Sequence, residues 1–325
     1  MDEPTPESVQ APAFKDRHAG LILCGIVLVL AGIGMVAMTA LMAVGLAAPP
    51  PPRGPAVDVR SVVSGIVFYL LMAVVLVWLG VGSILARRWA RALALVVSWL
   101  WLLGGVISAV VIGFVVPGLI AHVNPPAGQA LPDNFLPVVM TFVVGCVGVL
   151  FVIVPGLLVL FYRSPHVKAT CDARDPQVRW TDVCPPAILG LSLALALGAV
   201  TTLPMALLYQ PVIPFFGALV TGWPALLALV AGSGFQAWAA GATYSQKSSA
   251  WWAVLVATIV VMASSFVTFM RVDLLDFYRA AGYQDDMIAA FERIGFGSSR
   301  SLVLWSHALL VPLVGYMVSI RKLFR

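Results

Sequence analysis

Residues 183–246 read VCPPAILGLSLALALGAVTTLPMALLYQPVIPFFGALVTGWPALLALVAGSGFQAWAAGATYSQ, which is 64 consecutive positions without Lys, Arg, Asp or Glu. A water-soluble domain needs charged side chains on its solvated faces, and this stretch offers none. A helix crosses a bilayer with about 20 apolar residues, and a charge at its centre costs at least about 2.5 kcal/mol. The stretch therefore predicts membrane-spanning helices that have lipid as their solvent.

The rest of the chain extends this pattern. Of its 325 residues 61% are hydrophobic and 10% are charged, whereas soluble domains carry about 25% charged residues. The fold class that we expect is all-α, a polytopic transmembrane helix bundle of about eight spans. The charge-free runs place these spans at 21–47, 61–86, 92–120, 136–162, 187–209, 213–240, 250–270 and 301–320.

The same runs define the expected domain organisation. Residues 1–19, rich in proline and polar side chains, are predicted to be a disordered cytoplasmic tail. Residues 20–325 are predicted to form a single transmembrane helical domain with an inner loop 163–185 and an amphipathic outer loop 271–300. Spans 187–209 and 213–240 are separated only by Tyr209–Pro214, which predicts a helical hairpin with a proline-marked turn.

The distribution of basic residues predicts the orientation, because cytoplasmic loops carry an excess of Lys and Arg. Thirteen basic residues lie on the side that holds 15–17, 87–91, 163–179, 247 and 321–325, and six lie on the other side. We expect a multi-pass protein of the cytoplasmic (inner) membrane with both termini in the cytoplasm. No patch interleaves aromatic with basic residues, so the net charge of +5 favours lipid headgroups over nucleic acid as partner.

A tandem repeat of two four-span units (4+4) is one hypothesis for the architecture. Each unit has a short basic turn with Trp between its second and third spans, at Arg87–Arg91 and Lys247–Trp252. Each final span contains a proline, Pro155 or Pro312, several residues before an Arg. Units with an even number of spans would be parallel. A single bundle without a repeat accounts for these features as coincidences of any eight-span chain.

The inner loop contains the side chains that best suit a metal. His166, Cys171 and Cys184 are potential soft ligands, and Asp175 or Asp182 would complete four. A zinc site usually has paired short spacings such as C-x2-C, which this loop lacks. The favoured interpretation is an ordered surface loop in which Asp172, Asp175 and Asp182 pair with basic residues, and no cofactor is expected.

This loop also carries a resemblance. The run Phe161-Tyr-Arg-Ser-Pro-His-Val-Lys-Ala-Thr-Cys171, followed by Arg179-Trp-Thr-Asp182 and Cys184-Pro185, resembles a segment of uncharacterised bacterial multi-pass membrane proteins. The resemblance covers about 25 residues. It implies a bacterial membrane setting and no site residues.

Within the spans, the polar residues with the least ordinary positions are Gln236, His307, the Thr201–Thr202 pair and the Ser264–Ser265 pair. Such groups usually hydrogen-bond helices together. Gly190, Ala194 and Gly198 form a small-residue stripe that predicts close helix packing. As an alternative, Pro155, Gln236 and Pro312 would line a solute site, because bent helices frame the binding sites of many transporters.

The outer loop shows helical spacing of its apolar residues on both sides of Gly282. Leu274, Leu275 and Tyr278 share one face, and Met287, Ile288, Phe291 and Ile294 share another. We expect two short helices that lie on the membrane surface or cover the bundle.

These features favour a non-enzymatic accessory or assembly protein, with a membrane-protein partner or a second copy of the chain as its expected companion. Walker, dinucleotide-binding and HExxH motifs are absent from the sequence, and no acid lies inside a span. One alternative is a transporter or channel for an uncharged or lipid-like solute. Another is a membrane sensor or enzyme that acts through loop 163–185.

Overall fold

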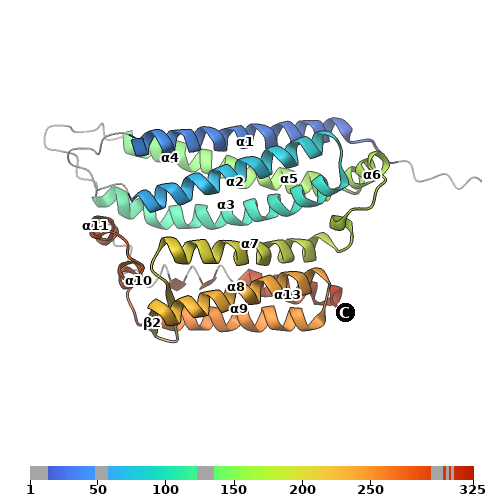
Figure 1. Cartoon of the computed structure of the whole chain (residues 1–325). Helices are drawn as coiled ribbons and strands as arrows, with labels where there is room; N and C mark the ends of the chain where they lie inside the picture. Colours follow the sequence, from blue (N-terminus) through green and yellow to red (C-terminus); the bar gives the residue numbers. More distant parts are fainter. Residues whose placement is uncertain (1–13, 48–57, 123–134, 294–302, 305–306, 309–310) are drawn as a thin grey trace, which may run out of the picture.

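The protein is a bundle of long antiparallel helices (Figure 1). The computed structural model describes residues 14–47, 58–122, 135–293, 303–304, 307–308 and 311–325. Seven described segments are long and apolar enough to cross a membrane. They lie in α1 (His18–Ala47), α2 (Val59–Ile84), α3 (Arg88–His122), the continuous α4–η1–α5 (Phe135–Gly148, Val149–Ile153, Val154–Arg163), α7 (Pro186–Leu208), α8 (Gly222–Tyr244) and α9 (Ser248–Phe269).

The all-α prediction is confirmed by these helices. The eighth expected span, 301–320, contains α13 (Val311–Ile320) and falls partly outside the described residues. The predicted tail, 1–19, lies outside them up to residue 13, and its last two positions belong to α1.

The helices form two groups that lie one above the other in Figure 1. The first group contains α1, α2, α3 and α4–η1–α5, and the second contains α7, α8, α9 and α13. The groups meet where α7 begins, because Ile188 and Leu189 are buried in the same apolar cluster as Ala92 and Leu95 of α3. The start of α7 thus belongs to the first core, and Leu195 farther along the same helix packs against the second.

Glycines allow α1 and α2 to approach each other closely. A Cβ at Gly25 would lie 2.7 Å from the carbonyl oxygen of Gly80, and a Cβ at Gly80 would lie 2.7 Å from that of Gly25. Larger side chains at these two positions would push the backbones of α1 and α2 apart. The small residues therefore set the distance between the two helix axes. The hydroxyl of Ser83 then donates to Leu21 O at 3.1 Å and lies 2.7 Å from the Tyr162 hydroxyl, which ties α5 to the pair.

Two turns at the same end of the bundle have the same geometry. Ala86 after α2 and Gln246 after α8 both adopt positive φ, 52° and 57°. Arg87 N donates to Gly82 O at 2.9 Å, and Lys247 N donates to Ala242 O at 3.1 Å. This is the pattern of a Schellman motif, which normally uses Gly at the left-handed position. The match occurs at an offset of 160 residues.

The predicted helical hairpin of spans five and six is formed by α7 and α8, which pack against each other, but its turn is longer than expected because residues 212–221 form a β-hairpin. Strands β1 (Val212–Phe215) and β2 (Ala218–Thr221) pair antiparallel around Phe216 and Gly217, whose φ values are +41° and +105°. Positive φ at both central residues is the mark of a tight two-residue hairpin turn. Pro211 and Pro214 lack the N–H donors that a helix would need, so α8 begins only at Gly222.

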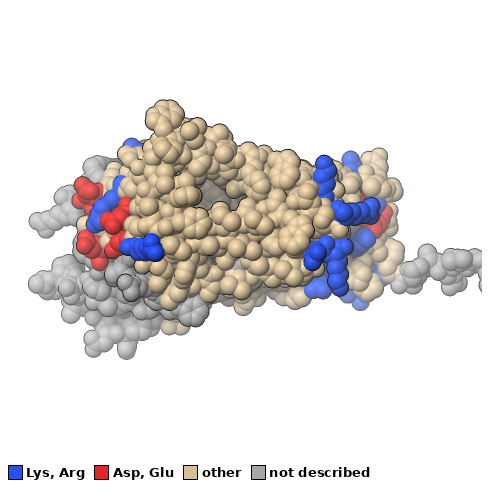
Figure 2. Space-filling view, turned by 90° about the horizontal axis from the view of Figure 1, so that it is seen from below, with Lys and Arg blue, Asp and Glu red and all other residues tan. Residues whose placement is uncertain are grey.

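The described charged side chains lie at the two ends of the bundle. Figure 2 shows a band without charged side chains between these ends. At one end, here called the basic end, lie α6 (Pro165–Arg174), η2 (Trp180–Asp182) and η3 (Arg321–Leu323). At the other, here called the acidic end, lie the β-hairpin, α10 (Leu274–Ala280) and α11 (Asp285–Arg293). The uncharged band is what a bilayer requires of the surface that it covers.

Candidate functional site

Hydroxyl groups inside the spans are mostly used to hold the structure together. Thr201 and Thr202 donate to the carbonyls of Leu197 and Gly198 one turn earlier, at 2.9 and 2.7 Å. Ser192 donates to Ala240 O at 2.9 Å and so links α7 to α8. Since an unpaired polar group in hydrocarbon costs several kcal/mol, these bonds account for the presence of these residues without a ligand.

Ser264 and Thr268 of α9 hold the β-hairpin. Phe216 N donates to Ser264 Oγ at 3.1 Å, and Gly217 N donates to Thr268 Oγ1 at 3.0 Å. Ser264 Oγ in turn donates to Pro214 O at 3.0 Å. The two side chains therefore satisfy backbone groups of the turn where it reaches the membrane. Ser265 instead lies 2.9 Å from Nε2 of His307.

The three residues of the predicted solute site lie on separate helices. Pro155 is in α5 of the first group and is buried, whereas Gln236 in α8 and Pro312 in α13 belong to the second group, with Pro312 exposed. The Oε1 atom of Gln236 is buried against Gly198 of α7, where a Cβ would lie 2.6 Å away. Gln236 is thus part of the α7–α8 contact, and a common solute site for the three residues stays a prediction.

The fourth span contains a π-helix next to Pro155. Residues Val149–Ile153 form η1, in which Val154 N donates to Val149 O five residues earlier. Pro155 has no N–H to donate, and a π-helix is a frequent mark of functional positions. Gly105 of α3 packs here so closely that a Cβ would overlap the carbonyl oxygen of Phe151. The irregular turn is therefore fixed by contact with α3.

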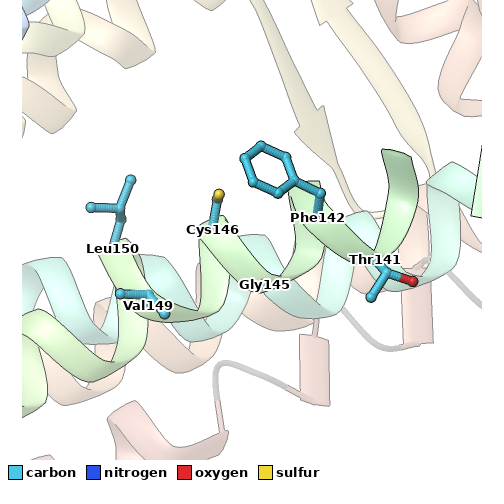
Figure 3. Close-up of a pocket in the computed structure, with 6 residues that line it drawn as sticks. All are labelled: Thr141, Phe142, Gly145, Cys146, Val149 and Leu150. Carbon is cyan, nitrogen blue, oxygen red and sulfur yellow. The ribbon is translucent and has the colours of Figure 1, made fainter. Parts of the chain in front are cut away.

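A hollow lies on the same helix, towards the acidic end. It has a volume of about 560 Å³. The described residues that line it come from α4 and η1 and are apolar apart from one hydroxyl: Thr141, Phe142, Gly145, Cys146, Val149 and Leu150. Figure 3 shows Phe142, Cys146 and Leu150 pointing to the same side of the helix. We call these six residues the α4 groove.

The α4 groove faces the surroundings of the bundle. The side chain of Phe142 is 70% exposed, and a Cβ at Gly145 would meet nothing within 4 Å. Because this surface lies in the uncharged band, it is covered by lipid or by another membrane protein. The α4 groove was not predicted from the sequence. The sequence pattern that could have indicated it is a spacing of four residues, which places Thr141, Gly145 and Val149, and likewise Phe142, Cys146 and Leu150, along one face of a helix.

At the basic end, the inner loop is held by ion pairs, as predicted. Asp175 is buried, accepts from Arg88 N at 3.4 Å and lies 3.8 Å from both Arg87 Nη1 and Arg179 Nη2. Arg88 Nε lies 2.9 Å from Asp172 Oδ1, in an ion pair without hydrogen-bond alignment. These contacts fasten the loop to the start of α3.

The predicted metal ligands of this loop lie in different surroundings. Cys171 and Cys184 are buried in the first core, whereas His166 is exposed. Burial raises the pKa of the Cys171 thiol to about 11 and also raises that of Cys184. Among the described residues, no group of three or more His, Cys, Asp or Glu is arranged to hold a metal ion. The structure thus does not join His166, Cys171 and Cys184 into a metal site.

At the acidic end, the two predicted short helices of the outer loop are confirmed as α10 and α11. Leu275 and Ile288 are buried beneath them, and Gly282 between them has φ +79°. The ring of Tyr283 stacks on that of Tyr209 at 5.0 Å, and the Tyr209 hydroxyl lies 2.9 Å from Ser61 Oγ of α2. Burial, and then the neighbouring Tyr209, raise the pKa of Tyr283 to about 12. The loop thus packs against the end of α7, and Tyr209 connects it to α2 of the first group.

Comparison with known proteins adds no family to this description. No protein-family model, no curated protein and no solved structure matches the chain significantly.

Proposed function

We propose that this protein is a non-enzymatic membrane protein that accompanies or assembles another membrane protein, and that the α4 groove receives an apolar transmembrane helix of that partner. The observation that carries the proposal is the groove itself, since it is apolar, open and on the lipid-facing side of one span. Gly145 and Cys146 leave room there for a helix to approach closely, as small residues do at helix–helix contacts in membranes.

The charge inventory of the bundle supports the same proposal. The described ionised side chains lie at the two ends, and the described hydroxyls inside the spans bond mainly to backbone carbonyls. Ion-coupled carriers and intramembrane enzymes usually place an ionisable group at depth. The excess of basic residues at the end that holds α6 and Arg325 favours the cytoplasmic (inner) membrane with both termini inside.

The experiment uses a photo-crosslinking amino acid at position 146 in the intact protein in its native membrane. We expect one discrete protein adduct, obtained reciprocally when the adduct partner carries the probe. The matched position is Leu207 of α7, which is 80% exposed and lies outside the groove. Adducts to lipid alone, or the same set of proteins from both positions, would contradict the proposal.

A glycine substitution tests the shape of the groove. Gly145→Leu would fill it, and because a Cβ at this position meets nothing within 4 Å, we expect the variant to keep its fold. The adduct from position 146 should be lost in this variant. Gly234→Leu in α8 is the control, since Gly234 is also exposed and in open space, and this variant should keep the adduct.

A solute transporter is the second candidate, and the π-helix beside Pro155 favours it. A span with an irregular turn and a proline near its middle is suited to bending. Transport would require α5 to move against α3. Gly105 lies at the close contact between these helices, and its lack of a side chain would allow this movement. Uptake of an uncharged solute that is lost in Gly105→Ala and retained in Gly104→Ala, whose Cβ has open space, would favour this function over the first.

A further inference from the structure

The basic end of the second helix group carries a compact set of positive side chains. Lys247 precedes α9, and Arg321, Lys322 and Arg325 follow α13. The two segments are fastened together, because Ser248 N donates to Arg325 O at 2.8 Å and Arg325 N donates to Gln246 O at 2.9 Å. The four side chains, here called the basic patch, therefore belong to one surface.

Aromatic rings set the depth of the patch relative to the membrane. The Arg321 guanidinium lies 5.3 Å from the ring centres of both Trp251 and Trp252. Trp251 Nε1 donates to Met317 O at 2.7 Å, and the Trp252 side chain is half-exposed. Tryptophan is enriched at the level of the lipid headgroups, so the patch lies where lipid phosphates are found.

The patch is not neutralised by the protein. The described acids of the basic end are all in ion pairs of the first group and its loop: Asp16 with Arg174, Asp172 and Asp182 with Arg88, and Asp175 with Arg87 and Arg179. In the described part of the chain, Lys247, Lys322 and Arg325 form no ion pair. Their side chains thus have no ion-pair partner among the described acidic side chains.

We infer that the basic patch binds the phosphate of an anionic phospholipid headgroup. Three ammonium or guanidinium groups come from two segments that are hydrogen-bonded to each other at this level, and the exposed Ser248 and Ser249 lie in the first turn of α9, where the helix dipole favours an anion. The apolar surface below Trp252 would contact the acyl chains of the same lipid. This inference does not depend on the proposed partner of the α4 groove.

The test measures lipid retained by the intact protein after extraction from bilayers of phosphatidylglycerol and phosphatidylcholine in equal amounts. The variant is Lys247→Gln/Lys322→Gln/Arg325→Gln, which leaves Arg321 and its tryptophans in place. Since each basic residue near an anionic surface contributes about fivefold in affinity, we expect retention of phosphatidylglycerol to fall about 100-fold with phosphatidylcholine unchanged.

The matched control is Lys15→Gln/Arg163→Gln/Lys168→Gln, which removes the same charge from exposed positions at the same end of the first group. It should retain phosphatidylglycerol as the unaltered protein does. An equal loss in the control would overturn the site, as would equal retention of both lipids. Displacement of the bound lipid by inorganic phosphate alone would assign the patch to free phosphate instead. If the triple variant does not fold, Lys322→Gln alone should lower retention about fivefold.

Discussion

Asp175 is the side chain that most firmly connects the inner loop to the bundle. It is 2% exposed and faces two arginines and a backbone N–H. Asp175→Asn would leave Arg87 and Arg179 without their partner. Hydrogen bonds to charged groups contribute about 1.5–3 kcal/mol, so we expect a loss of about that size in the unfolding free energy in detergent. Asp172→Asn, at a half-exposed acid, should cost clearly less, and equal losses would contradict this account.

The Cys171 thiol should be unreactive in the folded protein. Because burial raises its pKa to about 11, the folded state favours the neutral thiol. The resulting stabilisation is complete below the ordinary thiol pKa of 9.0 and is lost as the pH rises from 9.0 towards 11. Alkylation by iodoacetamide, followed by mass spectrometry, should be slow at pH 8 until the protein is denatured. Rapid modification of the native protein would show that Cys171 is accessible.

At the scale of single residues, the sequence predicted some roles and not others. The pairing of Asp172, Asp175 and Asp182 with basic residues was predictable, because both charges gather at the same end of the spans, but the role of Arg87 and Arg88 from a different turn was not. The groove residues were not, since Gly145 and Cys146 are ordinary residues of an apolar helix. Their significance depends on which neighbours are missing, and a single helix does not reveal its neighbours.

At the scale of elements, the α1–α2 contact depends on glycine. Gly80→Ala would place a methyl 2.7 Å from Gly25 O, and such overpacking typically costs about 1–3 kcal/mol. We expect a lower midpoint of thermal unfolding in detergent. Gly34→Ala in α1, where a Cβ meets nothing within 4 Å, is the control and should be neutral or slightly stabilising. Equal destabilisation by both variants would contradict this role of the contact, because helix propensity alone favours Ala over Gly.

The length and position of the spans were predictable because the bilayer imposes them, but the irregular elements were not. The β-hairpin replaces the start of the sixth predicted span, since apolar residues alone do not distinguish a strand from a helix. The Schellman turns have Ala86 and Gln246 where Gly is usual, so they left no signal. The π-helix showed only Pro155, which regular helices also tolerate in membranes.

For the whole molecule, the threading through the membrane has a direct test. Single cysteines at Ala173 in α6 and Asp286 in α11, in a chain without other cysteines, should react with an impermeant maleimide from opposite sides. This result is expected because α6 and α11 lie at opposite ends of the bundle (Figure 1). Ser249→Cys is a control that should label from the same side as position 173. Labelling of positions 173 and 286 from one side would refute the arrangement of spans.

The two helix groups repeat some features at an offset of 160 residues. Ser83 and Thr243, both buried, precede the matching turns, and Arg87 and Lys247 follow them. The tandem repeat stays a prediction. If each group is a folding unit, residues 1–178 and 179–325 expressed as two chains should assemble and co-purify. The control, a break at residue 105 inside α3, should abolish assembly. Failure of the first pair would favour a single cooperative bundle.

The β-hairpin between α7 and α8 also bears on how the chain enters the bilayer during synthesis. Its residues and those of both flanking helices carry no charge, so no solvated ion must be carried across when this turn is translocated. The turn also lacks basic side chains that would keep it on the cytoplasmic side. The nearest basic residues on either side of this segment are Arg179 and Lys247. The translocon would thus receive α7 and α8 as one closed loop, with the turn passing through first.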